Sequence, residues 1–144
     1  MEISVTSWNL CGLSELSTDL NAFTWLTESD ILLVEESLHS GVPDLFKGYT
    51  VAEEYPARIT GGRPSGGLLL LIANRWLGSA TIIPLERERF LLAVRVLFGS
   101  VSFVISAIYV PVHSDDCPEH VEAMIETHLT SLASRFPGDI HIYG

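Results

Sequence analysis

Hydrophobic and polar residues alternate along the first positions of the chain and then change to a helical spacing. Residues 3–10 combine β-branched and aromatic side chains and stop at a Cys-Gly pair, which predicts a strand. Apolar residues then recur at spacings of four and three, which predicts a short amphipathic helix at residues 18–27. Residues 31–34 are all apolar, which is typical of a strand buried on both faces. The chain therefore opens with strand, helix and strand, as a βαβ unit does.

The middle of the chain predicts strands without helices. Four glycines and a proline at residues 59–67 indicate an exposed loop or hairpin connection. The link Gly99-Ser100 is typical of a second hairpin, and consecutive strands without an intervening helix predict an antiparallel meander. The expected strands lie at residues 49–52, 68–73, 80–85, 91–98 and 101–109.

The C-terminal part returns to helix and strand. Asp116 and Glu119 have the spacing of a capping box, and Pro118 suits a first helical turn. Apolar residues then trace one helical face as far as residue 136, where a Pro-Gly pair ends the helix. Residues 139–143 begin another strand.

The composition is that of a packed domain. The chain has 144 residues, of which 47% are hydrophobic and 18% charged, enough for one well-filled core and too few for two. Its longest apolar stretch, residues 68–73, is far shorter than the roughly 20 residues of a membrane helix, and the N-terminus shows no signal-peptide pattern. We therefore expect an intracellular protein with no membrane span. Its two cysteines, Cys11 and Cys117, are expected to be free thiols rather than zinc ligands.

The net charge argues against non-specific binding of nucleic acid. The chain carries 8 Lys plus Arg and 18 Asp plus Glu, a formal net charge of −10. Affinity for nucleic acid comes largely from neutralising phosphates, which requires the opposite sign. Two situations would reconcile the charge with such a substrate. A site that collects divalent cations uses carboxylates, and another part of the protein could carry the basic surface.

Three polar residues each close an apolar strand. Asn9 follows the first strand, Glu36 follows the buried strand, and Tyr109 follows the last strand of the meander. Strand ends are where layered α/β folds hold ligands, and carboxylate and amide oxygens suit Mg²⁺ or Mn²⁺. Taken singly, each residue is more typical of a turn, a solvated carboxylate or an edge tyrosine. Their joint occurrence at strand ends is what favours a site.

The segments around these residues resemble motifs of the endonuclease/exonuclease/phosphatase superfamily. Five segments occur in the superfamily's order and spacing. In chain order they are similar to its Trp-Asn motif (residues 7–12), Gln-Glu-Thr motif (30–37), Gly-Gly motif (62–68), Tyr-x-Pro motif (108–111) and Gly-Asp-x-Asn motif (141–144). Together they extend over the whole chain. The third segment, Arg-Pro-Ser-Gly-Gly, is especially similar to the endonuclease domains of non-LTR retrotransposon polyproteins.

The resemblance implies a fold and a set of roles. The fold would be α/β, a partial four-layer αββα sandwich (DNase I-like) with a mixed, mostly antiparallel sheet and two flanking helices. It would be truncated, so that residues 1–144 form the N-terminal half of a single domain. Asn9 and Glu36 would be metal-site residues for Mg²⁺ (or Mn²⁺), with Glu36 as a direct ligand and a catalytic residue. Tyr109 would be catalytic as well, bonding the scissile phosphate or supporting the nucleophile.

The implied activity is divalent-metal-dependent phosphodiester hydrolysis by a DNA endonuclease of retrotransposon type. DNA would be the partner of the complete domain, and the protein would enter the nucleus at some stage. The superfamily also needs an Asp-x-Asn pair and a late Asp-His pair that this chain lacks, so the isolated chain is expected to be inactive. It is also expected to associate through exposed strand faces and edges.

Two alternatives stay open. A phosphatase of the same superfamily would show the same five segments. A non-catalytic, degenerate copy is favoured by Cys11, where a hard ligand is commoner, and by Glu35, where the superfamily usually has Gln.

Overall fold

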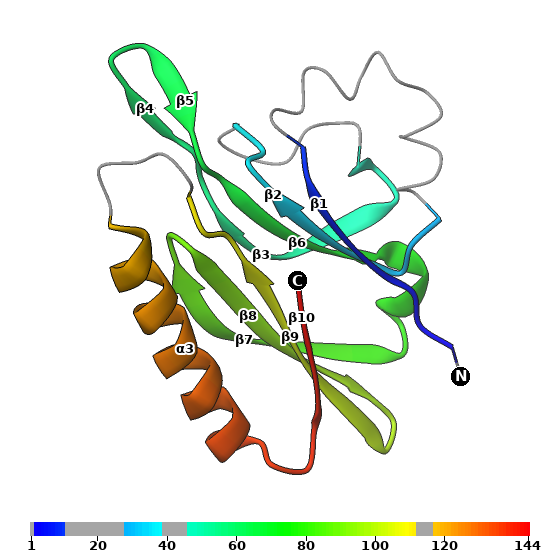
Figure 1. Cartoon of the computed structure of the whole chain (residues 1–144). Helices are drawn as coiled ribbons and strands as arrows, with labels where there is room; N and C mark the ends of the chain where they lie inside the picture. The colour runs from blue at the N-terminus through cyan, green and yellow to red at the C-terminus, as the bar shows by residue number, and fades with distance from the viewer. Residues whose placement is uncertain (1, 11–27, 39–45, 112–116) are drawn as a thin grey trace.

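Two four-stranded sheets pack face to face and form the body of the molecule (Figure 1). The computed structural model describes residues 2–10, 28–38, 46–111 and 117–144. Sheet I has the strand order β1 (Val5–Asn9), β2 (Ile31–Glu35), β6 (Leu68–Ala73), β3 (Tyr49–Tyr55). Sheet II has the order β10 (Ile140–Tyr143), β9 (Val101–Ile108), β8 (Leu91–Phe98), β7 (Ala80–Glu88). A separate hairpin consists of β4 (Arg58–Thr60) and β5 (Arg63–Ser65).

The continuous apolar strands lie in the middle of sheet I. In β2, Ile31 and Leu33 face sheet II, whereas Leu32 and Val34 pack on the opposite face of sheet I. Alternate residues of β6 likewise face sheet II and the opposite side of sheet I, and all six of its residues are buried. Because both faces are covered, these strands are apolar at every position, as the sequence predicts.

The helix α3 (Pro118–Arg135) covers the outer face of sheet II (Figure 1). Its buried side chains Val121, Ile125 and Leu132 pack against Leu91 and Ala93 of β8 and neighbouring residues of the sheet. The helix was predicted, and its N-cap is Cys117, which makes no side-chain capping bond. The predicted capping box depends on Asp116, which lies outside the described residues, as does the helix predicted at residues 18–27.

One connection differs from the prediction. The antiparallel meander contains β7, β8 and β9 but not β6, which lies in the other sheet between β2 and β3. The short 3-10 helix η2 (Asn74–Trp76) makes the crossing from β6 towards β7. β1 and β2 are parallel neighbours, as the βαβ pattern predicts.

Two strands, β3 and β7, are longer than predicted, and each contains a register shift. β3 has one between Val51 and Glu53, and β7 has one between Pro84 and Glu86. Each shift allows the strand to continue through charged residues on a sheet edge, where proline is also tolerated. The charged residues of β3 and β7 therefore lie in edge strands of the two sheets rather than in loops.

Candidate functional site

Asn9 and Glu36 lie at the same edge of sheet I because the strands that precede them run parallel. The register pairs Asn9 of β1 with Glu35 of β2, and the Leu10 N–H donates to the carbonyl oxygen of Glu35 at 3.0 Å. Glu36 is the next residue and is half-buried, whereas Asn9 is exposed. Asn9 therefore lies at the end of β1, next to the end of β2, and β2 leads directly into Glu36.

Tyr109 reaches the same place from the other sheet. It follows the last residue of β9, and its hydroxyl donates a hydrogen bond to Oε1 of Glu36, a residue 73 positions earlier in the chain. The Tyr109 N–H donates to the Phe90 carbonyl oxygen at 3.0 Å, and the two rings lie 6.4 Å apart between centroids. The tyrosine is therefore fixed by sheet II while its hydroxyl orients a carboxylate of sheet I.

The turn that carries Glu36 has a constrained backbone. Glu36 has a φ of 49° and Leu38 a φ of 55°, in the left-handed region that residues other than glycine rarely adopt. The Ser37 N–H donates to the Gly67 carbonyl oxygen at 3.3 Å, and the Leu38 N–H donates to that of Gly66 at 3.1 Å. Two glycines before β6 therefore brace the turn, and this local strain is maintained by contacts from outside it.

Glu35 adds a second carboxylate at this edge. Its Oε1 accepts a hydrogen bond of 3.1 Å from the Ser7 hydroxyl. Burial raises the pKa of Glu35, the Ser7 bond lowers it, and the charge of Glu36 raises it again, so that the pKa lies above its usual value. The end of β10 reaches the same region, since a Cβ on Gly144 would lie 2.7 Å from the Ser7 Cβ.

Strands from both sheets therefore end around one edge of the sandwich. Gly144 is tied to β9 by two backbone hydrogen bonds, from its N–H to Ser106 at 3.1 Å and from Ile108 to its carbonyl at 2.7 Å. The ends of β1, β2, β9 and β10 surround the position of Glu36. The structure brings the predicted residues Asn9, Glu36 and Tyr109 to this one place, and it adds a bracing role for Ser7, Gly66 and Gly67, which the sequence placed in motifs without that role.

The donor atoms at this edge fit a hard divalent cation. The Glu36 carboxylate and the Asn9 amide oxygen are suitable ligands, and Mg²⁺ typically keeps several waters while using one or two carboxylates. Among the described residues, no group of three or more His, Cys, Asp and Glu side chains is arranged to hold a metal ion.

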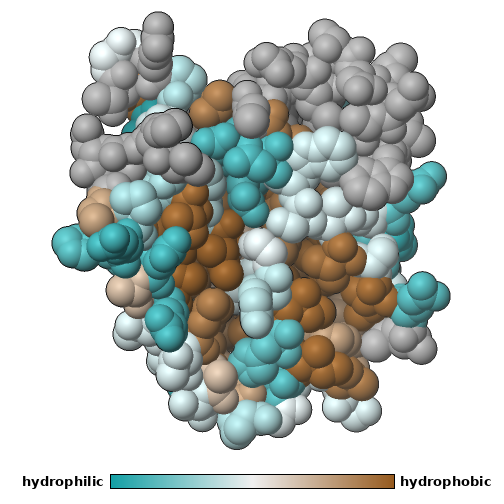
Figure 2. All heavy atoms as spheres, in the orientation of Figure 1, coloured by the Kyte–Doolittle hydropathy of each residue, from teal (hydrophilic) through white to brown (hydrophobic). Residues whose placement is uncertain are grey.

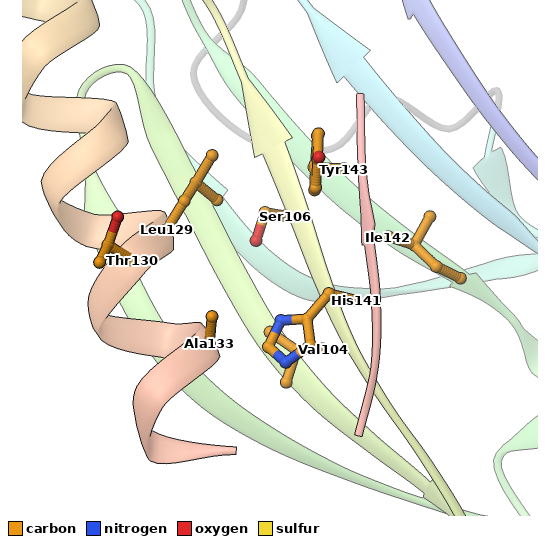
Figure 3. A pocket seen from close by; sticks show the side chains of 8 residues that line it. All are labelled: Val104, Ser106, Leu129, Thr130, Ala133, His141, Ile142 and Tyr143. Carbon is orange, nitrogen blue, oxygen red and sulfur yellow. The ribbon is translucent and has the colours of Figure 1, made fainter. Parts of the chain in front are cut away.

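A cavity of about 250 Å³ lies elsewhere, between α3 and β10 (Figure 3). Its lining includes Leu129 of α3, Ser106 of β9 and His141 of β10. A ring nitrogen of His141 lies 2.9 Å from the carbonyl oxygen of Phe136, at the end of the helix. The cavity is on the helix-covered face of sheet II and does not include Asn9, Glu36 or Tyr109.

Comparison with known proteins identifies the fold. No protein-family model matches the chain, and no curated protein sequence matches it. Solved structures do. The AP endonuclease LMAP from Leishmania major is 16% identical, with a TM-score of 0.58 over 92% of this chain and 47% of that chain. The endonuclease domain of TRAS1, a telomere-specific non-LTR retrotransposon, is 13% identical, with a TM-score of 0.57 over 87% and 52%. The chain has the DNase I-like fold.

The human Nocturnin catalytic domain, with bound sulfate, has the same fold at 13% identity and a TM-score of 0.61, over 92% of this chain and 59% of that chain. These three structures are members of the endonuclease/exonuclease/phosphatase superfamily, so the fold expected from the resemblance is confirmed. The chain spans about half the length of the structures it matches. None of the helices in the described ranges is long and apolar enough to span a membrane.

Proposed function

We propose that this chain carries the metal-binding and phosphate-binding part of a divalent-metal-dependent phosphodiesterase. The observation that supports this most directly is the hydrogen bond from Tyr109 of sheet II to Glu36 of sheet I, at the edge where Asn9 also lies. A carboxylate oriented by a phenol, beside an amide, is an arrangement that can hold a hard cation and a phosphate oxygen together. Residues 1–144 would then be the N-terminal half of a single domain.

Each residue has a distinct task in this proposal. Glu36 and Asn9 would hold Mg²⁺ or Mn²⁺, and such a cation polarises a phosphoryl oxygen and lowers the pKa of bound water. The Tyr109 hydroxyl orients the Glu36 carboxylate by donating its single proton to it, and it would have to turn that proton away from Glu36 to donate to a phosphate oxygen. Ser7 holds the side chain of Glu35, and Gly66 and Gly67 hold the turn of Glu36, so the ligands are positioned before a cation arrives.

The substrate we propose is DNA. The matched structures include an AP endonuclease, a retrotransposon endonuclease domain, and the 3′ phosphatase NExo from Neisseria bound to a product DNA hairpin. The Arg63-Pro64-Ser65-Gly66-Gly67 segment supports the retrotransposon type among these. A DNA substrate of that type would require entry into the nucleus.

Metal binding by the chain itself is the first test. In a Mn²⁺ titration followed by electron paramagnetic resonance, Glu36→Gln should weaken binding by at least about tenfold, because even indirect partners of metal ligands cost that much. Glu88→Gln, on an exposed residue of β7, is the matched control and should leave the affinity unchanged. Equal affinities in the two variants would show that Glu36 is not the ligand.

Activity is the second test, and it separates an enzyme from a degenerate copy. It uses the natural polypeptide that contains this sequence, incubated with supercoiled plasmid. We expect Mg²⁺-dependent nicking that is lost in Glu36→Gln. Nicking that survives the substitution would refute the assignment of Glu36. Hydrolysis confined to small phosphate esters would favour the phosphatase alternative, and no hydrolysis of either substrate would favour the degenerate copy.

A further inference from the structure

The cavity between α3 and β10 lies where the outer face of sheet II changes from apolar to polar side chains. Under α3 this face presents apolar residues such as Leu91 and Ala93 of β8. Val104 of β9 also packs with the side chains of α3, and its register partner in β10 is His141. Because neighbouring partners and alternate residues of a strand share a face, His141 and Ser106 point to the same side as Val104. Both polar residues therefore line the cavity rather than the interface between the sheets.

The hydroxyl of Ser106 has no hydrogen-bond partner among the described residues, although Ser106 is only 2% exposed. Its backbone carbonyl oxygen, by contrast, accepts a hydrogen bond of 3.1 Å from the Gly144 N–H. Buried hydroxyl groups are almost always bonded to the protein, to water or to a ligand. The cavity volume of about 250 Å³ is several times the roughly 30 Å³ that one water molecule occupies. There is therefore room for a ligand that bonds the Ser106 hydroxyl.

The imidazole of His141 adds a hydrogen-bond acceptor to the same cavity. Its Nε2 lies 2.9 Å from the carbonyl oxygen of Phe136, and because a carbonyl oxygen only accepts, Nε2 carries the proton of the neutral ring. Nδ1 is then an acceptor, and no described residue bonds it. Figure 3 shows one ring nitrogen on the side of Ser106 and Leu129, and it is the one next to the ring's attachment, Nδ1.

Apolar side chains surround these two polar groups. Leu129 of α3 and Val104 of β9 line the cavity, and Ala133 and Tyr143 are exposed, so the cavity opens to solvent. None of the described residues that line it has a carboxylate, an ammonium or a guanidinium group. Such a cavity suits an uncharged ligand with an apolar body and one polar group.

We propose that this cavity binds a small neutral phenol, in a role separate from the function proposed above. The phenol O–H donates to Nδ1 of His141, and the phenol oxygen accepts from the Ser106 hydroxyl, so one group satisfies both side chains. The aromatic ring packs against Leu129 and Val104. An amine of the same size would carry a charge that the lining does not neutralise, and an aliphatic alcohol is a weaker donor.

The test is binding of p-cresol to the natural polypeptide that contains this sequence, followed by backbone amide chemical shifts in NMR spectra. The methyl ether p-methylanisole has a similar shape but no O–H donor, so p-cresol should bind roughly fivefold more tightly, the factor expected for one net hydrogen bond. In His141→Phe, which keeps a ring at this position, the ratio of the two affinities should fall to about one. Ser106→Ala should also lower the ratio. A loss of stability would weaken both ligands alike and leave the ratio unchanged.

A change in the size of the cavity gives a second measurement. Ala133→Leu places a larger side chain at the opening and should weaken binding of both ligands by at least about tenfold. Ala123→Leu is the matched control, because it makes the same change at an exposed position of α3 outside the cavity and should leave both affinities unchanged.

Three outcomes would overturn the proposal. The first is no binding of p-cresol by the natural polypeptide, which would also result if another part of that polypeptide fills the cavity. The second is equal affinity for p-cresol and p-methylanisole, and the third is an unchanged ratio in His141→Phe. Glu36→Gln should leave the binding of p-cresol unchanged, so the phenol site and the proposed metal site stand or fall separately.

Discussion

Asp30 joins three segments at the end of sheet I opposite the candidate site. Its carboxylate accepts hydrogen bonds from the backbone and hydroxyl of Ser4, before β1, and from Arg75 and Trp76, in the turn after β6. Burial raises the pKa of Asp30, but the bonds from Ser4, Trp76 and Arg75 lower it more, to about 2. The charged carboxylate therefore stabilises the folded chain.

The lowered pKa of Asp30 predicts an acid-dependent loss of stability. Because its pKa is about 2 when folded and 3.8 ordinarily, the contribution is complete above about pH 4 and is lost as the pH falls towards 2. It amounts to about 2 kcal/mol, from the size of the shift.

Urea unfolding of Asp30→Asn should show a loss of about 2–3 kcal/mol at neutral pH and a flatter dependence of the free energy of unfolding on pH below about pH 4. The exposed neighbour Glu28→Gln should change the free energy of unfolding by less than about 0.5 kcal/mol. Identical pH profiles for Asp30→Asn and the original chain would contradict this account.

At the scale of elements, the sequence predicts the strands that burial determines and misses what depends on distant partners. The fully apolar runs in β2 and β6 identify buried strands without ambiguity. The sheet to which β6 belongs is not readable from its own residues, because both sheets would accept it. The candidate residues Asn9, Glu36 and Tyr109 follow from their positions at strand ends. The bond between Glu36 and Tyr109 could not be predicted, because it depends on how two sheets are stacked.

The link between the hairpin and the turn of Glu36 gives a prediction at the same scale. Gly67 has a φ of 96°, and a Cβ there would lie 2.3 Å from the Ser37 hydroxyl oxygen. Gly67→Ala should therefore lower the free energy of unfolding by about 2–4 kcal/mol, from backbone strain and a steric clash together. Since the clash displaces the residue after Glu36, affinity for Mn²⁺ should fall as well.

Gly66→Ala is the matched control for this change. Gly66 has a φ of 73°, and the Cβ of an alanine there would have no neighbouring atom within 4 Å, so only the backbone strain of about 1–2 kcal/mol applies. Urea unfolding and Mn²⁺ titration of both variants measure the difference. Equal losses in the two variants would mean that contact with Ser37 does not hold the turn.

At the scale of the molecule, apolar surface gathers on the face that carries β10 (Figure 2). β10 is an edge strand of sheet II, and β1 is the edge strand of sheet I on the same side, where Gly144 packs against Ser7. Ile140 and Tyr143 of β10 are 53% and 65% exposed. Edge strands with exposed apolar side chains pair readily with other chains, whereas charged residues at an edge prevent it.

This face predicts association of the chain with itself, and the edge of β10 is where a single charge should reduce it. Ile140→Lys removes apolar contact area from both copies in a dimer and places a strongly hydrated cation on the pairing edge, so the dissociation constant should rise by roughly tenfold or more. Sedimentation velocity over a range of concentrations measures the change. Ile83→Lys introduces the same charge on β7, the opposite edge of sheet II, at a side chain that is 37% exposed, and should leave association unchanged. If the two lysine variants weaken association equally, net charge rather than the edge of β10 controls it. A chain that stays monomeric at every concentration would show that this apolar face does not self-associate.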